Sequence, residues 1–81
     1  MPKINYEGFK KLDKGTQHLI EWQYHYAGDF VRLLFRTIAS ANDDNLELLA
    51  KAFPKEVQAY KNYAYVSGWW KEITDKIGMI Y

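Results

Sequence analysis

Both histidines of this chain lie in one short stretch, HLIEWQYHYAGD, together with two acidic residues. On a helix, His18, Glu21, His25 and Asp29 would share one face, and imidazole and carboxylate groups are common ligands of transition metals. The spacing differs from the i, i+4 histidine pair of known helical sites, and Asp29 lies beyond a glycine. The polar face of an amphipathic helix has the same spacing. We therefore favour a polar face, and a metal site on His18, Glu21 and His25 is the alternative.

The same stretch leaves its own conformation open. Its alternating apolar residues are typical of a β-strand, and they are Ile20, Trp22, Tyr24 and Tyr26. No second strand of similar quality exists to pair with it, and an isolated strand is not stable. A helix that ends or kinks at Gly28 and turns Leu19, Trp22 and Tyr26 towards the core is the favoured interpretation.

Other residues with chemical potential are basic. Arg32 and Arg36 lie four positions apart and could bind an anion. Lysines alternate with tyrosines further along the chain, which would suit stacking on single-stranded bases; they include Lys51, Lys55 and Lys61. However, the net charge is only +1, and proteins that bind nucleic acid are usually markedly basic. Binding of nucleic acid or a nucleotide is thus an alternative, and a solvated charged surface is the favoured interpretation.

The sequence does not indicate an enzyme. Neither Ser40 nor Ser67 has a histidine placed to activate it, no two carboxylates form an evident acid–base pair, and no glycine-rich loop could hold a phosphate. The chain has no cysteine, which excludes disulfides and thiolate metal sites. We expect no catalytic residue and no cofactor.

Aromatic residues are the most distinctive feature of the composition. They make up 17% of a chain of 81 residues, more than a thin core can hide. Large rings at a surface are typical of protein interfaces. Trp69 and Trp70 are adjacent, about 100° apart on a helix, and two such rings seldom both enter one core fully. We predict that these two residues, with Tyr60 and Tyr63, bind another protein.

The elements that position these residues are short helices. Residues 1–81 form one domain, with an extended N-terminus at 1–6 and a short helix at 7–14. We predict Gly15 as the C-terminal cap of that helix and Thr16 as the N-cap of the next. Asp29 would cap a helix that is apolar over most of its circumference, and we expect this helix to be the central one. Its predicted inner face comprises Phe30, Leu34, Ile38 and Ala41, with Val31 and Phe35 beside it.

Three more helices follow. Asn42 or Asp43 can cap the first, which has an apolar stripe of Leu46, Leu49, Ala50 and Phe53. Pro54 ends that helix and begins the next, whose predicted inner face is Val57, Tyr60 and Ala64. The last helix follows Gly68 and has Trp70, Ile73 and Ile77 on one face. The fold class is all-α, a compact bundle of four to five short helices.

The segment AGDFVRLLFRTIASANDDNLELLAKAFPKEVQAYKNY, followed by GWW, resembles small uncharacterised proteins of bacteriophages and mobile elements. The resemblance runs from Gly28 to about Trp70, just over half of the chain. The matching positions are Gly28, Phe30, Leu34, Phe35, Ile38, Ala41, Asn45, Leu49, Ala52, Phe53, Pro54, Glu56, Val57, Ala59 and Tyr60. Most are core or helix-boundary residues, so the resemblance implies an all-α fold and supplies no catalytic residue.

These observations together predict a small accessory or regulatory protein that acts by contacting another protein through exposed aromatic residues. Inhibition of a host defence system is one role that the resemblance suggests, and a homodimer is another outcome of the same surface. The N-terminal segment lacks an apolar signal core, and no run of apolar residues is long enough to cross a membrane. We therefore expect the protein in the cytoplasm of a bacterial host.

Overall fold

The structure, a computed structural model, describes residues 6–78. Within this range it contains six α-helices and no strand: α1 (Tyr6–Lys10), α2 (Lys14–Gln23), α3 (Asp29–Ser40), α4 (Asp43–Ala52), α5 (Pro54–Tyr65) and α6 (Trp69–Lys76). The all-α fold is thus confirmed, with six helices within this range where four to five were predicted. Tyr6 belongs to α1, so its predicted extended conformation is wrong, and residues 1–5 lie outside the described range.

The start of α2 differs from the predicted boundary. Asp13, not Thr16, is the N-cap, and its carboxylate accepts hydrogen bonds from the backbone N–H and the hydroxyl of Thr16. Gly15 is not a C-cap but lies in the first turn of α2, where the backbone of α5 is very close. A Cβ on Gly15 would lie 2.1 Å from the carbonyl oxygen of Lys55. Glycine is therefore needed here for close packing of the two helices.

The end of α2 settles the conformation of the opening stretch. The helix ends at Gln23, so the strand interpretation is wrong, and so is the helix that continues to Gly28. The backbone N–H of Tyr26 donates to the carbonyl of Glu21 at 2.7 Å, and that of His25 donates to the carbonyl of Trp22 at 3.2 Å. These two bonds define a Schellman motif, in which His25 occupies the left-handed position with φ = 64°. Gly28 instead precedes α3 as its N-cap, and Asp29, the predicted cap, is the first helical residue.

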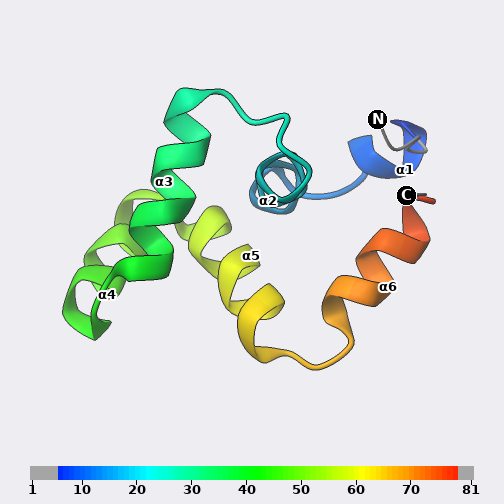
Figure 1. Cartoon of the computed structure of the whole chain (residues 1–81). Coiled ribbons are helices and arrows are strands. Elements are labelled where there is room, and N and C mark those ends of the chain that lie inside the picture. Colours follow the sequence, from blue (N-terminus) through cyan, green and yellow to red (C-terminus); the bar gives the residue numbers. More distant parts are fainter. Residues whose placement is uncertain (1–5, 79–81) are drawn as a thin grey trace.

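The core surrounds α5, which packs against α2, α3, α4 and α6 (Figure 1). Helix α3, which we expected to be central, packs mainly against α2 and α5. Its Leu34, Phe35 and Ile38 are buried as predicted, whereas Phe30 is 64% exposed, contrary to prediction. The largest cluster of buried residues is Leu19, Leu34, Phe35, Ile38, Val57 and Ala59.

The second half of the chain largely follows its sequence signals. Asn42 caps α4 by accepting a hydrogen bond from the N–H of Asn45 at 2.9 Å, and Pro54 opens α5, as predicted. Ala64, predicted to face the core, is exposed. A second buried cluster joins α2 to the C-terminal end and consists of Ile20, Ile73 and Ile77. None of the helices in residues 6–78 combines the length and apolar character needed to cross a membrane.

Candidate functional site: a basic hollow beside helix α3

The three candidate metal ligands do not come together. His18 and Glu21 lie on α2, whereas His25 lies in the turn after the helix end and is exposed. Among residues 6–78, no group of three or more histidine and acidic side chains is close enough to hold a metal ion. The predicted shared face fails because α2 ends at Gln23, two residues before His25.

His18 has a different partner. Its Nδ1 lies 3.1 Å from Oε2 of Glu56, a residue of α5 that is only 9% exposed. A carboxylate this deep needs a hydrogen-bonding partner, because a buried polar group without one destabilises the fold. The pair therefore stabilises the packing of α2 against α5, close to the contact between Gly15 and Lys55. We assign it a structural role.

The predicted protein-binding aromatics are packed rather than free. Tyr60, Tyr63, Trp69 and Trp70 are all partly buried against the core. The Tyr63 hydroxyl donates to Oε1 of Gln23 at 3.1 Å, and its ring meets Trp70 edge-on, with 5.2 Å between ring centroids. Trp70 also stacks on Tyr24 at 6.1 Å. These contacts connect α2, α5 and α6, so the rings contribute mainly to the interior.

The exposed apolar residues lie elsewhere, and two of them belong to α3. Leu33 lies on the outer face of this helix, away from buried Phe35, and is 51% exposed. Phe30 lies in the first turn, one turn before buried Leu34, and is 64% exposed. The Phe30 ring contacts Phe53 at the end of α4, with centroids 5.8 Å apart. The other exposed large apolar residues in the described range are Tyr6, Tyr26, Leu48, Tyr65 and Val66.

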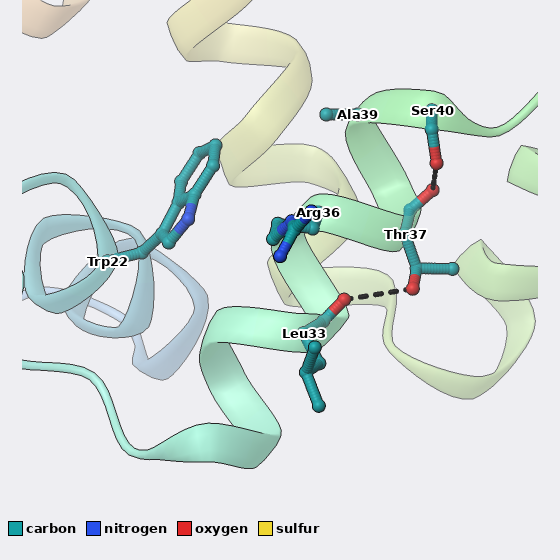
Figure 2. Close-up of a pocket in the computed structure, with 6 residues that line it drawn as sticks. All are labelled: Trp22, Leu33, Arg36, Thr37, Ala39 and Ser40. Atoms are coloured by element: carbon teal, nitrogen blue, oxygen red, sulfur yellow. Dashed lines mark hydrogen bonds between the residues drawn. The ribbon is translucent and has the colours of Figure 1, made fainter.

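Two connected hollows lie beside this face of α3. The larger, about 580 Å³, is lined by Trp22 of α2 and by Leu33, Arg36, Thr37, Ala39 and Ser40 of α3. Figure 2 shows the Trp22 indole extending from α2 towards α3, which carries the other five lining residues. The smaller, about 240 Å³, is lined by Trp22, His25, Ala27, Arg32 and Arg36. Because the two hollows share Trp22 and Arg36, we treat them as one site, the basic hollow.

The aromatic wall of the basic hollow is fixed by the core. The Trp22 ring stacks on buried Phe35, with centroids 5.2 Å apart and planes 10° apart, and it also contacts Tyr60. Phe35 itself is fully buried. One side of the indole is therefore held by the interior, while the residue remains partly accessible at the hollow.

The charge of the basic hollow is positive. Arg32 donates a hydrogen bond to the exposed carboxylate of Asp29 at 3.1 Å, so it is partly neutralised. Arg36 forms no hydrogen bond or ion pair with any residue between positions 6 and 78. No acidic residue is among those that line the two hollows. The site therefore has an arginine available for a ligand from outside.

The other predicted anion-binding residues are not part of this site. Lys61 lines a separate hollow between α4 and α5, together with Asp43 and Glu47. Lys51 and Lys55 are exposed and line neither the basic hollow nor the hollow that contains Lys61. On α6, a hydrogen bond and charge attraction from Asp75 raise the pKa of Lys71 above its ordinary value, so this cation is already paired.

Sequence reasoning identified both arginines but missed Trp22 and His25 as their neighbours. Trp22 was expected to face the core, and His25 was placed on a helix that ends before it. The left-handed backbone of His25 points to a functional role, but it can be recognised only after the structure shows that α2 ends at Gln23. Comparisons of this chain with family models, curated proteins and solved structures found no match.

Proposed function

We propose that this chain is a non-catalytic protein-binding module that docks through the outer face of α3. The observation that carries the proposal is the exposure of Leu33 at a hollow with a tryptophan wall, with exposed Phe30 three residues earlier on the same helix. Apolar side chains grouped with an aromatic ring and an arginine are typical of protein interfaces, where tryptophan and arginine contribute most of the binding energy.

The apolar area that α3 exposes limits how much Leu33 and Phe30 can contribute to binding. Full burial of a leucine or phenylalanine side chain is worth about 1.5–3 kcal/mol, so half-exposed Leu33 and Phe30 would each gain roughly 1 kcal/mol at an interface. These gains are modest, and association has its own entropic cost. Binding through α3 therefore needs Trp22 and Arg36 as well as the two apolar side chains.

The proposed biological role is that of a small accessory or regulatory protein of a phage or mobile element. The resemblance of residues 28–70 to such proteins supports it, and the partner would then be a host protein, with a defence protein as one class. Binding of nucleic acid has less support, because Lys61 shares its hollow with Asp43 and Glu47 and no lysine of residues 6–78 lines the basic hollow.

The test is co-purification of a tagged chain from its native host with three forms compared. The wild type should retain a partner in stoichiometric amount, and Leu33→Glu should lose it. Tyr65→Ser should retain the partner, because Tyr65 is 77% exposed but lies in a different hollow. Circular dichroism of all three forms controls for folding. Equal retention by wild type and Leu33→Glu would contradict docking through α3.

A further inference from the structure

The turn after α2 carries a residue that its backbone does not favour. In a Schellman motif the left-handed position is usually glycine, because a Cβ there is disfavoured. This chain has His25 instead, with φ = 64°. The His25 side chain forms no hydrogen bond or ion pair within residues 6–78, so no polar contact in this part of the fold compensates for the strain. Such conflicts concentrate at functional sites.

The position of His25 suggests that its imidazole contributes to ligand binding. His25 lines the smaller hollow with Arg32 and Arg36, and the Trp22 ring forms the apolar wall. Two guanidinium groups and an imidazole thus surround a space that contains no acidic lining residue. Arginine donates paired hydrogen bonds in a geometry that matches a carboxylate, and such charge-assisted bonds are the strong ones.

We infer that the basic hollow binds a carboxylate of the partner protein, from an aspartate or glutamate that is adjacent to an aromatic or aliphatic residue. Arg36 and His25 hold the carboxylate, and the neighbouring apolar side chain packs on Trp22 and Leu33. This inference rests on the proposed function and names the chemistry of the partner. The charge of the hollow selects an acidic segment over a basic or purely apolar one.

The experiment is an NMR titration of the full chain with three probes: 3-phenylpropionate, its uncharged amide, and inorganic phosphate. We expect 3-phenylpropionate to shift the Trp22 indole N–H and the Arg36 side-chain signals and to saturate, and the amide to have little effect. Removal of one charge-assisted donor should weaken binding roughly tenfold in Arg36→Gln. His25→Ala should also weaken it. Lys61→Gln is the matched control, because that exposed cation lies in another hollow.

Three results would overturn the inference: equal shifts with the amide, unchanged affinity in Arg36→Gln, or tighter binding of phosphate than of 3-phenylpropionate. The last would assign the hollow to phosphate groups instead. The inference and the proposed function fail separately. If Leu33→Glu abolishes partner capture but the carboxylate does not bind, the inference alone is wrong. If the carboxylate binds and partner capture does not depend on Leu33, the proposed function is wrong.

Discussion

Replacement of His25 by glycine should make the protein more stable and less able to bind. The wild-type backbone at this position is left-handed, with φ = 64°, and two backbone hydrogen bonds of 2.7 and 3.2 Å close the turn around it. The imidazole forms no hydrogen bond or ion pair with the rest of residues 6–78, so its removal breaks no polar contact there. The change in stability should therefore come mainly from the backbone.

The magnitude follows from two opposing terms. The left-handed conformation costs a residue with a Cβ roughly 1–2 kcal/mol, and glycine avoids this cost. Glycine also makes the unfolded chain more flexible, which offsets about 0.4–1 kcal/mol of the gain. The net stabilisation of His25→Gly is then about 0.5–1 kcal/mol. For a domain of this size, that raises the melting temperature by about 2–8 °C.

The assay is urea and thermal unfolding of wild type, His25→Gly and His25→Ala, followed by titration of each with 3-phenylpropionate. His25→Ala keeps the strained backbone and loses the imidazole, so its stability should remain close to that of the wild type. Both variants should bind the carboxylate more weakly. A His25→Gly protein that is no more stable than the wild type would refute the strain argument. Unchanged affinity in both variants would refute the role of the imidazole.

Three further substitutions, the first with a control substitution, test the packing that positions the site. Gly15→Ala would place a methyl group 2.1 Å from the Lys55 carbonyl oxygen, so it should destabilise the fold by about 1–3 kcal/mol in urea unfolding. Gly28→Ala, with no atom within 4 Å of its new Cβ, is the control and should change stability by less than about 1 kcal/mol; equal effects would contradict the close contact. Tyr63→Phe removes the hydrogen bond to Gln23 and should cost about 0.5–1.5 kcal/mol by thermal unfolding, and no measurable loss would show that this bond is not stabilising. Glu56→Ala removes the partner of His18 and should lower the free energy of unfolding by about 1–2 kcal/mol. A variant as stable as the wild type would contradict this role of Glu56.

The sequence predicted the helical fold well because local signals agreed with packing over residues 42–65. Asn42 is a strong N-cap, and Pro54 both ends one helix and begins the next, so these boundaries were correct. The start of α2 was wrong because Asp13 and Thr16 are both good caps, and only the fold selects between them. The predicted end of α2 was wrong because glycine is the usual residue in the left-handed position after a helix, which favoured Gly28. In the structure His25 occupies that position.

The candidate site was predicted only in part, and α3 shows why. The sequence identified the side of this helix that faces the core, at Leu34, Phe35 and Ile38, but not how far along the helix the core extends. Phe30 shares the face of Leu34 and Ile38, but it lies in the first turn of α3, where its ring contacts Phe53 and stays 64% exposed. Arg36 was identified from its charge. Its pairing with Trp22 depends on how α2 crosses α3, which no local pattern encodes.

The most direct test of docking through α3 is photo-crosslinking inside the native host. A photoreactive amino acid at position 33, in the outer face of α3, is compared with the same group at position 65, which is also exposed. The account predicts one abundant protein adduct from position 33 that is absent from position 65 and diminished by Arg36→Gln. The account is contradicted if position 33 yields no protein adduct, or if both positions yield the same one.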